Sequence, residues 1–472
     1  MHPKRLVKSI AVPSFAVFLL AASASAQSLF APPSVKVSNV IEGGGGGVSA
    51  ARCGTGVVVG FGDVEPGKPN SYDGFSYSKT KGATFTDGGT LSVASSADFV
   101  GSGAGFFPSN LTTSPAIACS NSTTFYYASA GSVGNPACGG VCSVPNASIA
   151  VSISRDGGVH WSLPVEAAHQ LSDTETFVSP SIAVDPSNPL RVWVAYLHYS
   201  QNPSGDSAFV FCDLPGYFIE FAGSSDGGKT WFGGGFPSAI DYSCGNGASP
   251  EHTGALGAPV IVVSPAGAIY IAYEFMKQEP LTGKPIRNEI RFLRSLNHGK
   301  TFGPPTTVST DAVALSRVQM AVDRTNSRYH GAIYLTWSGK PSGTYTDVLV
   351  SDSLNAGASF SFPRAISANP AANTGRYQTD PVIAVDNDGL VAACFYETPH
   401  NQPSHTSVYS YNCGASFNHG ATWQAHSIAN SVPVGYGALT VDFLLLNDGF
   451  FGAYAILSGG KRSVVGKTGD AN

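Results

Sequence analysis

The sequence predicts an all-β fold assembled from a repeated unit of short strands, and three observations lead to this fold class. The 472 residues include 55 glycines and 31 prolines, and only 12% are charged, a composition that disfavours helices and suits strands joined by turns. A turn motif recurs along the chain. An apolar hairpin recurs between the copies of that turn, which is the pattern of a repeat protein. We therefore expect almost no helix.

The recurring turn has the pattern Ser-x-Asp/Asn-x-Gly-x-Thr/Ser-Trp/Phe. The Asp or Asn can accept hydrogen bonds from its own turn, the glycine supplies a positive φ, and the closing aromatic ring can tuck beneath. The weakest copies have Thr80 in place of the acid and His160 in place of the hydroxyl residue. The six copies lie roughly 60 to 75 residues apart, room for one four-stranded sheet each. They begin at Ser78, Ser154, Ser224, Ser295, Ser353 and Ser416.

The element between two turns is a pair of apolar strands joined by a short polar turn, as in "SPSIAVDPSNPLRVWVAYL" and "APVIVVSPAGAIYIAYEF". Near-continuous apolar strands are expected where neighbouring sheets cover both faces of a sheet. Seven hairpins and six turns then predict a β-propeller of four-stranded blades, each with an inner hairpin, a third strand, the turn and a fourth strand.

The two ends of the chain bear on the number of blades. After the seventh hairpin one strand remains, "KRSVVGKT", and a lone strand, "SVKVSNV", begins at Ser34. We expect this N-terminal strand to complete the last blade and close the ring, so that no sheet edge stays open. Seven blades are favoured, with six as the alternative if the terminal hairpin packs otherwise.

The first 26 residues predict a signal peptide. Lys4, Arg5 and Lys8 precede an apolar run, and Ala24 and Ala26 provide the small-x-small pattern of a cleavage site. The run is too short to span a membrane, and no later stretch reaches the ~20 apolar residues of a spanning helix. We expect the remainder, 27–472, to form a single monomeric propeller domain that is secreted to the periplasm or beyond, without a membrane span.

Eight cysteines in an oxidising compartment predict disulfides. No histidine stands at ligand spacing beside them, so no metal and no other cofactor are expected. A formal charge of -5 provides no basic stripe, which argues against nucleic acid as a partner. The expected pairs are Cys138 with Cys142, Cys212 with Cys244, and Cys394 with Cys413.

With its repeated turns the chain resembles the Asp-box (BNR) repeat β-propellers, the superfamily that includes the sialidases. The resemblance extends over essentially all of 27–472. It implies that the turns are structural and lie on the face away from the active site. Because such propellers include sialidases, other glycosidases and proteins without known catalysis, the resemblance is specific for the fold and less so for the function.

On the functional face of a propeller the inner strands begin and the second strands end. Arg52, Arg317 and Arg376 stand at or just before inner strands in this interpretation. Similar sialidases hold the substrate carboxylate with three arginines, whose planar forks suit a carboxylate. The alternative is that these arginines pair with loop carbonyls or nearby acids. The Phe/Tyr-Arg-Ile-Pro motif of the first sialidase arginine is absent, since Arg52 stands in "AARCG".

The resemblance also implies a tyrosine nucleophile assisted by a carboxylate, with an aspartate as the acid/base. The catalytic candidates at this face are Asp63, Glu274, Glu397 and Tyr377, and Tyr436 is a candidate for substrate binding. Each acid has an ordinary alternative. The two glutamates, each following a tyrosine, could be solvated rim charges, Asp63 could cap a turn, and Tyr377 could be an aromatic wall.

The sequence thus predicts a secreted sialidase-like glycoside hydrolase acting on terminal sugars of a glycan or glycoconjugate. One alternative is a non-catalytic propeller that binds glycan or protein at the cell surface, and a weaker one is a polysaccharide lyase with a Tyr/His pair. The side chains found together at the pore distinguish these three functions. A hydrolase requires two acids or a Tyr/Glu pair within about 10 Å of each other at the pore, a lyase requires Tyr and His there, and a binding protein requires neither.

Overall fold

The structure is a computed structural model, and it describes most of the chain from residue 29 to residue 471. For the stretch from 426 onward it describes backbone pairing only. The gaps in the description are 31–34, 39–47, 65–70, 92–104, 109–114, 135–147, 170–174, 201–212, 235–238, 247–251, 281, 314–316, 342–344, 367–375, 400–407, 434–441, 447–448 and 459–460. The expected signal peptide therefore lies outside the described residues.

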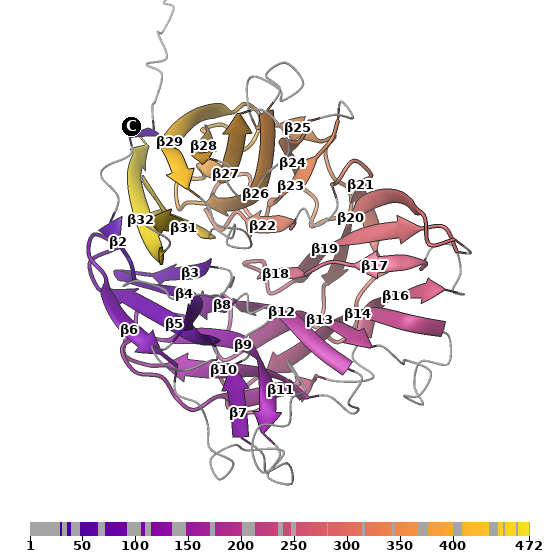
Figure 1. Cartoon of the computed structure of the whole chain (residues 1–472), viewed down its shortest axis with the longest axis horizontal. Coiled ribbons are helices and arrows are strands. Elements are labelled where there is room, and N and C mark those ends of the chain that lie inside the picture. Colours follow the sequence, from indigo (N-terminus) through magenta and orange to yellow (C-terminus); the bar gives the residue numbers. More distant parts are fainter. Residues whose placement is uncertain are drawn as a thin grey trace, which may run out of the picture.

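The described strands form antiparallel sheets arranged around a central axis, the architecture of a β-propeller with four-stranded blades (Figure 1). Six sheets are regular blades, each made from one continuous stretch of chain, and we number them I to VI in chain order. Their main strands are β3 Val48–Cys53, β4 Gly56–Val64, β5 Ser71–Ser78 and β6 Thr86–Thr90 in blade I; β8 Ala116–Cys119, β9 Phe125–Gly134, β10 Ser148–Ser154 and β11 Val165–His169 in II; β12 Glu175–Val184, β13 Val192–Ser200, β14 Asp213–Ser224 and β15 Phe232–Gly233 in III; β18 Val260–Val263, β19 Ile269–Gln278, β20 Pro285–Ser295 and β21 Thr306–Ser309 in IV; β22 Gln319–Val322, β23 Ile333–Gly339, β24 Asp347–Ser353 and β25 Arg364–Ala365 in V; and β26 Arg376–Val385, β27 Val391–Pro399, β28 Val408–Ser416 and β29 Gln424–Pro433 in VI.

Three further strands extend individual blades. β7 Gly105–Pro108 pairs with β9, β16 Ala239–Asn246 pairs with β14, and β17 Gly254–Leu256 pairs with β19. In the described part of the chain no helix is long and apolar enough to cross a membrane.

The remaining sheet is built from both ends of the described chain. β30 Asp442–Leu446, β31 Gly449–Ser458 and β32 Lys461–Ala471 pair in order, and two short strands, β1 Leu29–Phe30 and β2 Val35–Lys36, pair with β32. The described part of the C-terminal stretch supplies three strands, and β1 and β2 are added from the other end of the chain, so this sheet differs from the regular blades. The regular blades therefore number six, the count given as the alternative, and not the favoured seven.

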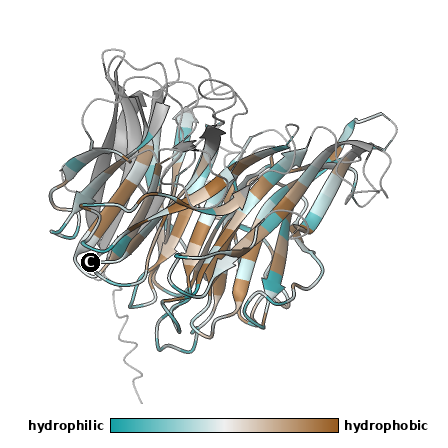
Figure 2. Ribbon diagram, turned by 90° about the horizontal axis from the view of Figure 1, so that it is seen from below, coloured by the Kyte–Doolittle hydropathy of each residue, from teal (hydrophilic) through white to brown (hydrophobic). Residues whose placement is uncertain are grey.

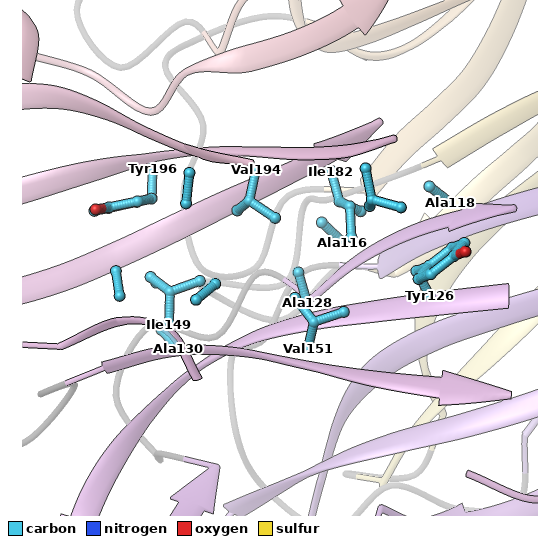
Figure 3. Close-up of a cluster of buried hydrophobic side chains, with 14 of the residues drawn as sticks. Ala116, Ala118, Tyr126, Ala128, Ala130, Ile149, Val151, Ile182, Val194 and Tyr196 are labelled. Atoms are coloured by element: carbon cyan, nitrogen blue, oxygen red, sulfur yellow. The ribbon is translucent and has the colours of Figure 1, made fainter. Parts of the chain in front are cut away.

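The inner strands are apolar because neighbouring blades cover them on both faces. Between blades II and III, Ala128 and Val151 face Ile182 and Val194, all within one buried cluster (Figure 3). All seven residues of β10 are buried. Apolar residues run through the middle of the strands, while hydrophilic residues gather toward the loops (Figure 2). The small alanine side chains on blade II leave room for the branched side chains of blade III, so that the sheets can approach closely.

The six repeated turns share one hydrogen-bond pattern. In the copy that begins at Ser224, the serine Oγ accepts a hydrogen bond from the Gly228 N–H at 2.8 Å and donates to Asp226 Oδ1 at 2.8 Å. Asp226 Oδ1 in turn accepts the Thr230 N–H at 3.0 Å. The same three contacts recur from Ser154, Ser295, Ser353 and Ser416, and Thr80 Oγ1 replaces the acid in the copy from Ser78.

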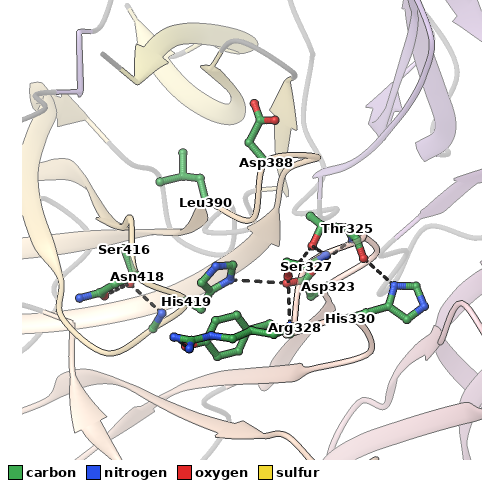
Figure 4. A network of polar contacts seen from close by, with 12 residues as sticks. Asp323, Thr325, Ser327, Arg328, His330, Asp388, Leu390, Ser416, Asn418 and His419 are labelled. Carbon is green, nitrogen blue, oxygen red and sulfur yellow. Dashed lines mark hydrogen bonds and ion pairs between the residues drawn. The ribbon is translucent and has the colours of Figure 1, made fainter.

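These turns lie beside the turns that join the first and second strands of the blades. The Gly227 N–H donates to Leu190 O at 2.8 Å, and in the turn of blade VI His419 reaches Asp323 of blade V at 3.6 Å (Figure 4). We call this side of the propeller the turn face. The opposite side, where the inner strands begin, is the mouth face, on which function was expected.

Two complete disulfides are described. Cys394–Cys413 bridges the directly opposite residues of β27 and β28, as the sequence predicted. The second disulfide, Cys53–Cys119, was not expected and joins the turn-face ends of β3 and β8 in neighbouring blades. Cys244 is also disulfide-bonded. The other three cysteines of the expected pairs, Cys138, Cys142 and Cys212, lie outside the described residues.

Candidate functional site

A central cavity of about 410 Å³ lies between the inner strands of all six regular blades. Because the inner strands run from the mouth face to the turn face, the cavity has one end at each face. Its lining comprises 48–53, 115–119, 179–184, 258–262, 317–320, 324 and 380–382.

The mouth end of this cavity has unusual backbone geometry. Ser179, Arg317 and Asp380 have φ values of 52°, 37° and 49°, in the left-handed region that non-glycine residues rarely occupy. In β12 and β26 the strand register shifts at these positions, just before Pro180 and Pro381. Residues in sparsely populated backbone regions cost of order 1–3 kcal/mol each and cluster at functional sites. Their grouping here makes the mouth end the leading candidate site.

Asp380 is the acid at this end of the cavity, and it is half-buried. Burial raises the pKa of Asp380, while a hydrogen bond from the Thr379 hydroxyl and the charge of Arg317 act in the opposite direction. At the equivalent place before the proline, blades III and IV have Ser179 and Ala258. A carboxyl group that holds its proton more readily than usual thus stands beside a guanidinium on the cavity wall.

Glu397 lies on the neighbouring strand β27 with two side-chain donors. Arg376 Nη1 donates to its Oε1 at 2.6 Å, and Gln378 Nε2 donates to its Oε2 at 2.9 Å. Gln378 is fixed in turn, because its Oε1 accepts the Val348 N–H of blade V at 3.0 Å. Tyr377 packs edge-on against Tyr345, with ring centroids 5.5 Å apart. Arg376 is therefore engaged by an acid, which was the alternative to its role in a carboxylate clamp.

The strand register brings Asp380 and Glu397 together. Gln378 lies directly opposite Glu397, and Asp380 is two residues farther along β26. Asp380 stands within the register shift between Thr379 and Val382, so the two acids are carried by adjacent strands near the start of β26. Three sequence-predicted residues, Arg376, Tyr377 and Glu397, therefore lie together at one corner of the mouth in blade VI, and Arg317 of blade V lies beside Asp380.

Other predicted residues lie elsewhere. Arg52 does not begin an inner strand: it is the fifth residue of β3, next to the Gly54 turn, and its Nε donates to Gly54 O at 3.0 Å on the turn face. Its expected place at the mouth was wrong because β3 begins at Val48. The backbone of Asp63 is near the end of β4, but its side chain and the whole of Tyr436 lie outside the description.

Glu274 lies in β19 of blade IV and is 2% exposed, so it is not a solvated rim charge. It packs against Gly257, where an added Cβ would come within 3.1 Å of the Glu274 Cβ. The residue before it, Tyr273, is hydrogen-bonded to Asp241, and both burial and that carboxylate raise the pKa of Tyr273 well above its ordinary value. These side chains of blade IV are therefore buried within the protein.

A second buried group lies in blade III. His198 Nδ1 contacts Glu220 Oε1 at 2.8 Å, and the Tyr196 hydroxyl donates to Glu220 Oε2 at 2.7 Å. All three side chains are nearly or fully buried, and the His198 ring lies between the rings of Phe177 and Phe218. Among the described residues no group of His, Cys, Asp and Glu could hold a metal ion.

Asp380 was the site residue that sequence reasoning missed. The repeated inner-strand motif has a small residue before proline in "SPAIACS", "SPSIAV" and "APVIVV", whereas "DPVIAV" has an acid. An acid at a position where three other blades have a small residue was the available signal.

No family model matches the chain, and no curated protein matches it. Among solved structures, the chain is similar to a protein of unknown function from Dyadobacter fermentans, with 13% identity over 76% of this chain and 94% of that one and a TM-score of 0.50. It is also similar to an α-L-arabinofuranosidase from Fusarium graminearum (11% identity, 93% and 97% coverage, TM-score 0.49) and to a Hadza microbial sialidase (16%, 76% and 65%, TM-score 0.45). At these identities the first likeness supports the fold alone.

Proposed function

We propose that this protein is a glycoside hydrolase that releases terminal sugars from glycans at the mouth corner of blade VI. The observation that carries the proposal is the pair of carboxyl groups, Asp380 and Glu397, in contrasting surroundings. Burial raises the pKa of Asp380, which suits a proton donor. Glu397 accepts hydrogen bonds from Arg376 and Gln378, which fix the orientation of its carboxyl group.

In this mechanism protonated Asp380 gives its proton to the glycosidic oxygen as the bond from that oxygen to the anomeric carbon breaks. Glu397 removes a proton from a water molecule, whose oxygen forms the new bond to the anomeric carbon. A carboxyl separation of about 6.5–9.5 Å leaves room for this water and leads to inversion. Arg317 would bind a carboxylate or hydroxyl group of the sugar, and the Tyr377 ring would form one wall of the site.

Three further inferences come from the sequence. We infer that the repeated turns are Asp boxes, that the mixed sheet of β1, β2 and β30–β32 closes the ring, and that the first 26 residues direct secretion. The Cys394–Cys413 and Cys53–Cys119 disulfides support an oxidising compartment. In this proposal the protein acts on glycans as a monomer and without a cofactor.

The test is hydrolysis of a panel of aryl glycosides, including an aryl sialoside and an aryl arabinofuranoside. We expect turnover of at least one sugar, with a loss of about 10²–10⁴-fold in kcat for Asp380→Asn and for Glu397→Gln. Asp388→Asn is the matched control, because this exposed acid lies on the turn face of the same blade (Figure 4). No turnover by the folded chain would favour the non-catalytic binding propeller, and a glycan array would then identify what it binds.

A further inference from the structure

The exposed large apolar side chains of this protein gather on the turn face. Among the described residues there are eight, and Ile286, at the start of β20, is the one on the mouth face. Exposed apolar side chains that gather on one side of a molecule mark an interaction surface, whereas scattered ones are ordinary. Of the other seven, Leu190, Leu296, Leu354 and Phe417 lie within turns of the turn face, and Leu163, Phe232 and Phe362 follow a repeated turn within two residues.

Three of these side chains occupy the same position of the repeated turn. Leu296, Leu354 and Phe417 are the second residues of the turns in blades IV, V and VI, with exposed fractions of 62%, 64% and 36%. In each turn the preceding serine donates to the following asparagine, so the residue between them extends into solvent. In blades I to III this position carries Lys79, Arg155 and Ser225.

The three apolar turns belong to blades that follow one another around the ring (Figure 1). The turn of blade V is bonded to blade IV, since Arg294 Nη1 donates to Ala356 O at 2.8 Å. The turn of blade VI reaches Asp323 of blade V through His419. The apolar side chains therefore project from neighbouring blades on one side of the molecule. Because they stand on separate turns, they suit a partner surface that each can enter on its own.

The turn face is also basic. In its described turns seven lysines and arginines are exposed, against two exposed aspartates, Asp156 and Asp388, although the whole chain has a formal charge of -5. Two further aspartates, Asp226 and Asp386, are half-buried and accept backbone hydrogen bonds within their own turns. The matching partner therefore has an anionic surface and an apolar interior. The exposed cations in the apolar half are Lys300 in blade IV and Arg324 and Arg328 in blade V.

The charge of this face distinguishes between two possible partners. A second copy of the chain, docked turn face to turn face, would place two basic surfaces against each other. A lipid bilayer with anionic headgroups instead provides negative charge at its surface and hydrocarbon beneath it. Protein surfaces that combine lysine or arginine with leucine or phenylalanine bind such bilayers through buried apolar area and attraction to the anionic lipid.

We propose that the turn face binds peripherally to a lipid bilayer that contains anionic headgroups. Leu296, Leu354 and Phe417 enter the interfacial layer, and Lys300 and Arg328 lie beside the lipid phosphates. The mouth of the propeller then faces away from the membrane. This surface is independent of the proposed hydrolase activity, because it lies on the opposite face and uses none of the residues of the mouth corner.

Co-sedimentation with vesicles of phosphatidylcholine, with or without phosphatidylglycerol, tests the proposal. We expect the full chain to bind the anionic vesicles about 10-fold more tightly than the neutral ones, and more weakly in high salt. The triple variant Leu296→Ser, Leu354→Ser and Phe417→Ser should lose at least about 10-fold in affinity. Lys300→Gln and Arg328→Gln should each lose about 5-fold. Ile286→Ser is the matched control, because Ile286 is 55% exposed on the mouth face, and its affinity should be unchanged.

Several results would overturn the proposal. They are equal binding to both kinds of vesicle, an equal loss in Ile286→Ser, and no binding to anionic vesicles. Loss of binding in residues 27–472, which lack the apolar N-terminal run, would assign the binding to that run instead. A dimer in sedimentation velocity that the triple variant abolishes would assign the face to contact between two copies.

Two further measurements keep this proposal separate from the hydrolase. Thermal unfolding checks that the triple variant keeps its fold, as expected for substitutions of exposed side chains. Hydrolysis of the aryl glycosides should be the same in the triple variant and in the native chain. Failure of vesicle binding would therefore leave the proposed activity standing, and absence of hydrolysis would leave membrane binding standing.

Discussion

The turn face and the mouth face of this propeller satisfy their polar groups in different ways. In a turn such as Ser224–Thr230, donor and acceptor lie within four residues of each other. At the mouth, Glu397 is held by Gln378, 19 residues away, and Gln378 by Val348, 30 residues away. The turns are near copies of one another, whereas equivalent mouth positions carry Ser179, Ala258 and Asp380. The residues that are repeated from blade to blade build the fold, whereas the residues that differ between blades lie at the candidate site.

The largest effect is expected from Asp73, a fully buried acid of β5 with its backbone opposite Gly62. Burial raises the pKa of Asp73 to about 7, against a hydrogen bond from Ser129. Because the folded-state pKa lies above the ordinary value of 3.8, this group's stabilisation is fully present below about pH 4. It is lost as the pH rises to 7, at a cost of about 4 kcal/mol.

Asp73→Asn should remove this dependence and raise the free energy of unfolding at pH 8 relative to the native chain. Urea unfolding at pH 4, 6 and 8 measures it, with the exposed Asp388→Asn as the control. Equal stability of the native chain at pH 4 and pH 8 would contradict a buried carboxyl group whose pKa is raised to about 7.

Smaller effects on stability, opposite in sign to each other, are expected from substitutions at two adjacent turn residues of blade V. Gly357 has φ of 75°, and a Cβ there would meet the ring of Phe292 at 2.2 Å. Gly357→Ala should therefore destabilise the protein by about 1–3 kcal/mol. Ala356 also has a positive φ, 55°, which costs an alanine about 1–2 kcal/mol.

Ala356→Gly should relieve that cost. Because glycine loses more conformational entropy on folding than alanine does, the net stabilisation should not exceed about 1 kcal/mol. Urea unfolding of the two single variants gives both signs in one comparison. Destabilisation by both substitutions would show that the neighbouring blade, rather than the local backbone, decides what these turn positions tolerate.

The smallest effect is expected from a turn carboxylate. Burial alone would raise the pKa of Asp226, but hydrogen bonds from Thr230, Ser224 and Lys229 outweigh it and lower the pKa to about 2. The folded-state pKa is below 3.8, so this stabilisation is present above about pH 4 and is lost as the pH falls toward 2. Solvent exposure of the turn keeps it small.

Asp226→Asn should keep the fold, because Asn297, Asn355 and Asn418 occupy the same position in other turns. The fall in Tm between pH 5 and pH 2.5 should be smaller in this variant than in the native chain. Asp388→Asn again provides the control, and an identical fall in all three proteins would show that the turn carboxylate contributes nothing measurable.

The sequence by itself determined the strands, the repeated turns and their hydrogen bonds, because these depend on residues within a few positions of one another. It also indicated Glu397, Arg376 and Arg317 as residues near the mouth. Only the tertiary structure decided that Arg376 is engaged by Glu397, that Arg52 lies on the turn face, and that Asp380 shares the mouth corner. It likewise decided the Cys53–Cys119 disulfide and the count of six regular blades. Each of these depends on strand register or on the packing of one blade against another, and those are set by contacts between residues far apart in the chain.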